Sequence, residues 1–340
     1  MAQRFGSGTP EAVGVDFSFS DDQVMFRDAV SDLLSKECPP EAVRAAWEND
    51  TGRTSGLWEA LAEMGVVGMT APTSAGGLGM DETDLVLLLE EAGRAALPEP
   101  LLEHTAVGIP TLAEAGGPVA EAWLEQAAAG EATLGAGASD GYAVGAAACE
   151  LVLLIGEQVR AVPTDGASLV EHRSIDGSRR LFEVSGDAVA LDADPALAFD
   201  RAAAAAAAQC VGVAQHLLDA TVAYAAQRFQ FGKPVGSYQA VKHHLADTAF
   251  KIEFARPAAR HAAWCIAAAD PDRSRDVSLA KALASEAVDL AARTALQCHG
   301  AIGYTYEYDL HLWMKRGWAL SACWGDAAWH RNRIAVALGI

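Results

Sequence analysis

The sequence predicts an α+β protein that is mostly helical, with an N-terminal helical domain, a small middle β domain and a C-terminal four-helix bundle. Three observations favour this class. Hydrophobic residues make up 51% of the chain, and the most frequent is alanine, the residue with the highest helix propensity. A Val- and Leu-rich stretch broken by Gly, Pro and Asp separates two helical regions. The second of these regions contains long amphipathic segments with short connections, which is typical of a bundle.

The N-terminal domain is expected over residues 15–130. Ser20 and Gln23 have the spacing of a capping box, and Phe19 stands where a hydrophobic staple would pack on the first turn. An apolar stripe with helical spacing follows and extends to Leu34. A loop is expected over 72–79, and the other predicted helices cover 56–69, 80–97, 106–115 and 118–129.

The middle domain is expected over residues 131–196 and consists of at most six or so short strands. The segments with strand character are 149–164, 168–175 and 179–191. Gly137–Gly141 matches the pattern G-x-S-x-G, but neither a strand before it nor a helix after it is evident from the sequence. We therefore do not expect a nucleophile elbow there.

The C-terminal domain is expected over residues 197–340. Its long helices are predicted at 198–228, 238–269 and 276–300, and one or two more are predicted within 306–338. The turn Gly232-Lys233-Pro234 separates the first two of them. Pro257 lies inside the second helix, where it either kinks the helix or marks a local irregularity.

Charge and cysteine usage exclude several functional classes. With 45 acidic and 25 basic residues the net charge is -20, so the chain lacks the cationic surface that binds nucleic acid or an anionic membrane. No apolar stretch has the length of a membrane span, and the Ala202–Ala208 run is too short. In the six cysteines we identify no CxxC pair or short His/Cys ligand spacing. The sequence therefore predicts no metal, no disulfide framework and a cytoplasmic location.

Two motifs in the C-terminal domain carry the functional interpretation. The first, RFQFGKPVGSYQAVKHHLAD, runs from Arg228 to Asp247, and the second, QCHGAIGYTYEYDLHLWMKR, runs from Gln297 to Arg316. With the N-terminal stretches GLWEALAEMGVVGMTAP and LLEEAGRA, they resemble the acyl-CoA dehydrogenase family over about residues 15–335. Each C-terminal motif alone could arise by chance, whereas both in one helical bundle are specific.

This resemblance implies contacts to FAD that is bound mainly by a neighbouring subunit. It assigns Arg228 to the FAD diphosphate, Phe231 to an apolar contact and Gln239 to a polar contact. The second motif adds Gln297 and a glycine turn that lets the backbone approach the diphosphate. In this turn Gly300 and Gly303 match the family, whereas Ala301 replaces its second glycine.

Other roles for these residues remain open. Arg228 could interact with the negative end of its own helix dipole, and Gln297 could form an ordinary interhelix hydrogen bond. The aromatic residues of the motifs could belong to the core; they are Phe231, Tyr238, Tyr304 and Tyr306. His243 and His244 have no partner spacing that suggests ligands, so we expect them at the surface.

The chain departs from the family at the catalytic base. The reaction needs a carboxylate that removes the proton alpha to the thioester, and the family places a glutamate at one of two positions. Here those positions hold Trp324 and Ala202, neither of which can accept a proton. Asp326 is the least implausible substitute, and the other nearby acids are Glu307, Asp309 and Asp200.

The middle domain also departs from the family, because it is about half as long and lacks the recognisable loops that hold the flavin and thioester. The resemblance is therefore to the smaller, base-lacking subunit of heterotetrameric actinobacterial acyl-CoA dehydrogenases that act on steroid side chains. A larger partner subunit would supply the glutamate and bind most of the acyl-CoA, and an electron-transfer flavoprotein would accept the electrons. The alternatives are a self-sufficient homo-oligomer that uses Asp326 and a flavin-free scaffold subunit.

Overall fold

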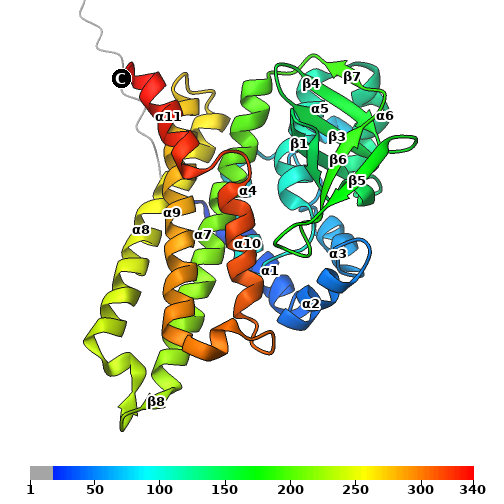
Figure 1. The fold of residues 1–340 in the computed structure, drawn as a ribbon. Coiled ribbons are helices and arrows are strands. Elements are labelled where there is room, and N and C mark those ends of the chain that lie inside the picture. Colours follow the sequence, from blue (N-terminus) through cyan, green and yellow to red (C-terminus); the bar gives the residue numbers. More distant parts are fainter. Residues whose placement is uncertain (1–17) are drawn as a thin grey trace, which may run out of the picture.

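A computed structural model describes residues 18–340 (Figure 1) and confirms the predicted fold class. Its N-terminal part is helical, and the predicted capping box between Ser20 and Gln23 is present. A helix over Pro40–Glu48 was not predicted, and the helix predicted over 56–69 ends at Glu63. The helices of this part are α1 Asp21–Glu37, α2 Pro40–Glu48, α3 Leu57–Glu63, α4 Glu82–Arg94, a π-helix Leu102–Gly108, α5 Ile109–Ala115 and α6 Gly117–Ala128.

The middle part is one sheet of seven strands in the order β5-β6-β2-β1-β3-β4-β7. Only β1 and β3 pair in parallel; the other neighbours are antiparallel. The sheet is thus larger than the predicted six or so strands. The strands are β1 Leu134–Ala138, β2 Tyr142–Val144, β3 Leu151–Ile155, β4 Val159–Pro163, β5 Ser168–His172, β6 Leu181–Ser185 and β7 Val189–Leu191.

The two strands that the sequence did not reveal, β1 and β2, flank the G-x-S-x-G stretch. A strand does precede this stretch, contrary to the sequence interpretation, but a turn and a second strand follow it. A nucleophile elbow needs a strand-to-helix turn, so the pattern belongs to a β-hairpin.

The C-terminal part is a bundle of long helices, with the predicted break between the first two. The break is a small hairpin, β8 Phe229–Gln230 and β9 Lys233–Pro234, that projects beyond one end of the bundle (Figure 1). The second helix runs through Pro257 without interruption. The helices are α7 Pro195–Gln227, α8 Gln239–Ala267, α9 Arg273–His299, α10 Leu310–Ala322 and α11 Ala327–Leu338.

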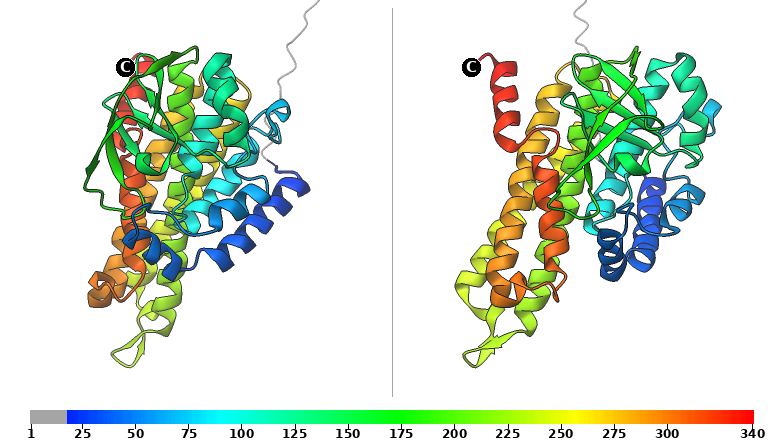
Figure 2. Two further views of the ribbon diagram at one scale, coloured as in Figure 1. Left: turned by 90° about the vertical axis from the view of Figure 1, so that its right-hand side faces the viewer. Right: turned by 45° about the vertical axis from the view of Figure 1, so that its right-hand side comes forward.

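Helix α7 is the central helix of the molecule and packs against α4, α8, α9 and α10. Its alanines from Ala202 to Ala208 are all buried. By length and composition α7 is the one described helix that could cross a membrane, but 78% of its most apolar window is buried inside the protein. We interpret it as a core helix. The sheet lies beside the α11 half of the bundle, away from the β8 hairpin (Figure 2).

Candidate functional site

The predicted site residues fall into two separate regions of the molecule. One is a cavity between the sheet and the bundle, near the turn from α10 to α11. The other is the end of the bundle that carries the β8 hairpin (Figure 1).

The cavity has a volume of about 500 Å³ and mostly apolar walls. The sheet contributes β1 and β2, the bundle contributes Phe199 of α7, and the α10–α11 turn contributes Trp324 and Gly325. Its charged lining residues in the described part of the chain are Glu103, Asp140 and Arg179.

Trp324, at the first of the two expected base positions, lies in the wall of this cavity. It is half-buried, its backbone is in the left-handed region (φ 55°), and its ring packs edge-on against Phe199 with 6.0 Å between centroids. A ring nitrogen of His330 lies 2.8 Å from the Trp324 carbonyl oxygen. The buried Lys281 donates to the Gly325 carbonyl at 2.9 Å, so the turn is held firmly. The cavity wall therefore carries an indole at the position where the sequence comparison led us to look for a carboxylate.

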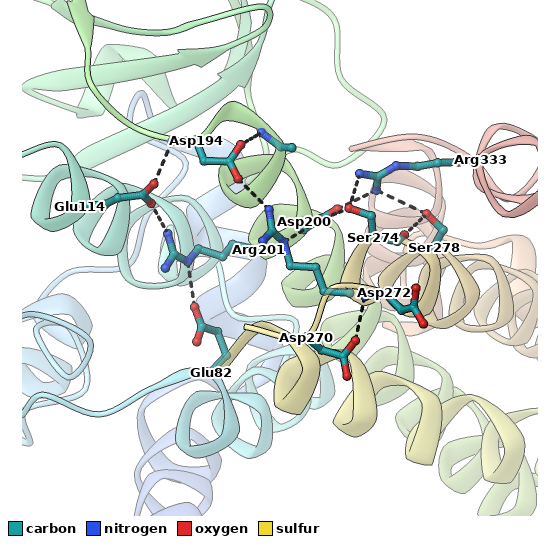
Figure 3. A network of polar contacts seen from close by, with 12 residues as sticks. Glu82, Glu114, Asp194, Asp200, Arg201, Asp270, Asp272, Ser274, Ser278 and Arg333 are labelled. Atoms are coloured by element: carbon teal, nitrogen blue, oxygen red, sulfur yellow. Dashed lines mark hydrogen bonds and ion pairs between the residues drawn. The ribbon is translucent and has the colours of Figure 1, made fainter. Parts of the chain in front are cut away.

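Ala202, at the second expected base position, is fully buried in α7. The nearby Asp200 is fully buried too, but its carboxylate is engaged by other side chains (Figure 3). Ser274 and Arg333 each approach it to 2.6 Å, and Arg273 approaches it to 3.2 Å. Asp200 thus ties α7 to α9 and α11.

The other acids considered as substitutes have structural contacts or are exposed. Asp326 is the N-cap of α11, where its carboxylate accepts a hydrogen bond from the Trp329 backbone N–H at 2.8 Å. Asp309 accepts from Arg44 Nε at 2.7 Å, and Glu307 is exposed. None of these three is among the residues that line the cavity.

Sequence reasoning missed Glu103, a charged residue of the cavity wall. It lies on the π-helix, is 1% exposed, and accepts a hydrogen bond from Arg179 Nη2 at 2.6 Å. Its second carboxylate oxygen has no hydrogen-bond partner among the described residues. The available signal was an acid inside the mostly apolar run PLLEHTAVGIP, because such an acid is seldom buried without a specific partner.

The second region, the bundle end, brings the two C-terminal motifs together. The side chains of Arg228, Gln239 and Gln297 are all exposed, and Phe231 is 92% exposed. The rings of Tyr224 and His299 stack 4.2 Å apart, which joins the end of α7 to the end of α9. Arg228, Phe231, Gln239 and Gln297 thus face solvent at one end of the molecule.

The glycine turn after α9 is open on its outer side. Gly300 has a φ of +65° and ends α9, and a Cβ placed on it would meet no atom within 4 Å. Ala301 is exposed beside it, whereas Gly303 is buried against His299 and Leu310. The turn can therefore present its backbone to a ligand or to another chain.

Most of the motif aromatics are not core residues. Tyr304 and Tyr306 are 77% and 67% exposed, like Phe231, while Tyr238 is partly buried and donates to the Gln230 carbonyl at 3.2 Å. His243 and His244 lie on the exposed surface of α8, as expected. The Arg228 backbone N–H donates to the Tyr224 carbonyl, and its guanidinium has no partner among residues 18–340.

Comparison with known families matches both helical parts of the chain. Residues 20–131 match the acyl-CoA dehydrogenase N-terminal domain, and residues 195–339 match the acyl-CoA dehydrogenase C-terminal domain. The acyl-CoA dehydrogenase IpdE2 of Mycobacterium tuberculosis is 35% identical over 87% of this chain and 91% of its own length. IpdE2 of Mycolicibacterium smegmatis is also 35% identical, over 87% of this chain and 92% of its own.

Solved structures have the same fold. A variant of the Tcur3481-Tcur3483 steroid ACAD (acyl-CoA dehydrogenase) is 25% identical with a TM-score of 0.85, covering 94% of this chain and 98% of its own. A chain of the ChsE4-ChsE5 complex from Mycobacterium tuberculosis has a TM-score of 0.86 at 24% identity, covering 96% of this chain and 99% of its own. At that identity, the second likeness concerns the fold alone.

Proposed function

The chain belongs to the acyl-CoA dehydrogenase family, and on that premise we propose that it is the base-lacking subunit of a heterotetrameric, FAD-dependent enzyme. A larger partner subunit supplies the catalytic glutamate and most of the acyl-CoA cleft. This chain supplies contacts to the partner's FAD from the bundle end. The complex introduces a double bond between the alpha and beta carbons of an acyl-CoA thioester.

The observation that carries the proposal is the indole of Trp324 in the cavity wall. Removal of the alpha proton needs a carboxylate within hydrogen-bond reach of the alpha carbon of the substrate. Indole has only an N–H donor and cannot accept that proton, and Ala202 has no functional group. Because the first expected base position holds indole, we propose that another chain supplies the base.

The bundle end fits a diphosphate-containing cofactor offered by a neighbouring chain. The exposed Arg228 guanidinium can form a bidentate, charge-assisted contact to a phosphate group. Gly300 leaves room for close approach of the backbone, and Gln239 and Gln297 add exposed amide groups. When bound, FAD supplies the acceptor for the hydride that leaves the beta carbon.

Exposed aromatic side chains near the bundle end support the docking of a protein partner there. Phe229 is 61% exposed on the hairpin, and on α8 Phe250 and Phe254 are 62% and 58% exposed with ring centroids 4.5 Å apart. Clustered exposed aromatic side chains are characteristic of protein interfaces. We therefore place the larger subunit against the hairpin and the outer face of α8.

The proposed substrate follows from one of the structural neighbours named above. Because one structural neighbour is a steroid ACAD, we propose a CoA thioester of a steroid side chain or a related acyl group as the substrate. An electron-transfer flavoprotein is the proposed acceptor. The six cysteines are free thiols, which fits a reducing cytoplasm.

Co-purification tests the proposal. The chain expressed alone should be colourless, whereas co-expression with a full-length homologue that carries the glutamate should give a yellow, active complex. Such a homologue is best sought in the reading frames next to this one. A yellow and active homo-oligomer of this chain alone would overturn the proposal.

One observation favours a second candidate, a self-sufficient enzyme: the buried carboxylate of Glu103 lies in the cavity wall. The Arg179 guanidinium donates to this carboxylate at 2.6 Å, so one of its oxygens is already engaged. The variants Glu103→Gln and Asp326→Asn separate the candidates. Asn is as good an N-cap as Asp, so Asp326→Asn leaves the fold intact. Our proposal predicts unchanged turnover of the complex for Asp326→Asn, and a self-sufficient enzyme based on Asp326 predicts a large loss.

A third possibility, a flavin-free scaffold, is separated from our proposal by Arg228→Ala. A scaffold makes no contact with FAD, so the flavin content of the complex would not change.

A further inference from the structure

A cluster of metal-ligating side chains lies where α8 ends and α9 begins, apart from both regions described above. His261 and Cys265 are one helical turn apart on α8, and Asp276 lies in the first turn of α9. The Cys265 sulfur is 3.5 Å from His261 Nε2 and 3.7 Å from Asp276 Oδ2, and the last two atoms are 3.6 Å apart. Three different ligand types thus converge on one point.

These separations match one face of a tetrahedral zinc site. Typical zinc bonds are about 2.3 Å to sulfur, about 2.0–2.1 Å to nitrogen and about 2.0–2.2 Å to oxygen, which gives tetrahedral edges of about 3.4–3.6 Å. Hydrogen bonds can also join these groups, because the Cys265 thiol can donate to Asp276 while His261 Nε2 donates to the sulfur or to Asp276. The metal titration below distinguishes the two arrangements.

Charge and surroundings also suit a divalent cation. A Cys265 thiolate and the Asp276 carboxylate together neutralise the charge of Zn²⁺, and a neutral His261 completes the set. Arg275 donates to both oxygens of Asp276 at 3.0 Å, in the manner of an outer-shell group that orients a ligand. Cys265 is fully buried, whereas the side chains of His261 and Asp276 are 33% and 13% exposed. An ion can therefore enter from the His261 side.

We propose that His261, Cys265 and Asp276 bind one zinc ion, with water as the fourth ligand, and that this ion ties the end of α8 to the start of α9. The mixed sulfur, nitrogen and oxygen set favours zinc over magnesium or calcium. The sequence prediction of no metal site was drawn from the absence of short His/Cys spacing and overlooked His261-x-x-x-Cys265. That i, i+4 spacing puts both ligands on one helix face. This inference does not depend on the proposed function.

Cobalt titration of the metal-free full chain tests the site, because Co²⁺ replaces Zn²⁺ and reports its ligands. We expect one Co²⁺ to bind per chain with a thiolate-to-cobalt charge-transfer band and tetrahedral d–d bands. Zinc should displace it and raise the thermal unfolding midpoint. Cys265→Ser should abolish the charge-transfer band, and Cys298→Ser, a half-buried thiol outside the cluster, should keep it.

Two further variants keep the result interpretable if Cys265→Ser folds poorly. His261→Gln alters a partly exposed residue and should weaken cobalt binding by about a hundredfold or more, and Arg275→Gln should weaken it by about 10–100-fold. Absence of stoichiometric cobalt binding by the folded chain would overturn the proposal. So would a charge-transfer band that persists in Cys265→Ser.

Discussion

Two residues, Trp324 and Arg228, underlie the proposal that this chain and a partner subunit each supply part of the active site. Trp324 stands at one of the two expected base positions and lies in the cavity wall, whereas Arg228 is exposed at the far end of the bundle. Among the described residues the Arg228 guanidinium has no partner, which suits an anion that comes from outside this acidic chain. On our proposal, both residues belong to a chain that contributes cofactor contacts and relies on its partner for the base.

Arg228→Ala should weaken FAD retention in the heteromeric complex. Loss of a charge-assisted hydrogen bond costs about 1.5–3 kcal/mol, which corresponds to a dissociation constant for FAD raised about 10–150-fold. Fluorescence of the flavin that is released when the complex is diluted measures this dissociation constant. Arg160→Ala, an exposed arginine of β4, is the matched control and should leave FAD binding unchanged. Equal FAD affinity in the Arg228 variant would favour a scaffold.

His104 should make the stability of the chain depend on pH. Burial lowers the pKa of His104 from 6.5 to about 3, and its ring nitrogens lie 3.1 Å from the Ala127 carbonyl oxygen and 2.9 Å from the Leu134 backbone nitrogen. Between about pH 3 and pH 6.5 the His104 ring is protonated in the unfolded chain but neutral in the folded chain. The free energy of unfolding should therefore fall as the pH drops below 6.5, by about 1.4 kcal/mol per pH unit from this residue.

Urea unfolding between pH 7.5 and 4.5 measures this dependence. His216 and His330 contribute in the same direction, because burial lowers the pKa of each to about 4. His104→Gln retains a donor and an acceptor, so the variant should unfold with a smaller pH slope than the parent chain. An identical slope would show that the His104 ring is not held neutral in the folded state.

At the scale of elements, the crossing of α4 and α7 depends on glycine. A Cβ on Gly212 would lie 1.9 Å from the Glu90 carbonyl oxygen, and one on Gly93 would lie 2.1 Å from the Gln209 carbonyl oxygen. Because both carbonyl oxygens belong to a helix backbone, neither can move away without shifting its whole helix. The two helices that join the N-terminal part to the bundle therefore approach as closely as their backbones allow.

Gly212→Ala should destabilise the fold by about 1–3 kcal/mol or more, since overpacking forces the helices apart. Thermal or urea unfolding measures the loss. Ala223→Ser on the exposed side of the same helix is the control and should cost about 0.5 kcal/mol or less. A gain in stability in the glycine variant, as helix propensity alone would predict, would contradict the packing described here.

The elements also show what sequence reasoning could and could not reach. Long periodic helices, the capping box at Ser20 and the break at Gly232 were predictable because each depends on local pattern. Strand β1, LGAGA, was not, because glycine and alanine have low strand propensity and its pairing with β2 and β3 is set by tertiary structure. Helix α2 was missed because it is short and begins at the second of two consecutive prolines.

The candidate site was predictable only in part, for a related reason. Motif residues such as Arg228 and Gln297 follow from spacing along the chain. The cavity wall combines Glu103, Arg179 and Trp324, which lie far apart in sequence and meet only through the packing of sheet on bundle. The cluster at His261 likewise needs the α8–α9 turn to bring Asp276 to the two α8 ligands.

At the scale of the whole molecule, the two regions lie toward opposite ends of the bundle (Figure 1). On our proposal, the bundle end of this chain contacts a neighbour's FAD and the neighbour supplies the base. A heterotetramer of two such chains and two full-length partners would then carry active sites only where the partner provides the glutamate. On this proposal the chain is active only together with its partner.

The ratio of flavin to polypeptide in the purified complex tests this account most directly. Flavin absorbance after denaturation, combined with the amount of each subunit, gives that ratio. We predict one FAD for each pair of this chain and its partner, and none for this chain alone. One FAD per chain in an active homo-oligomer of this chain, without any partner, would contradict the account.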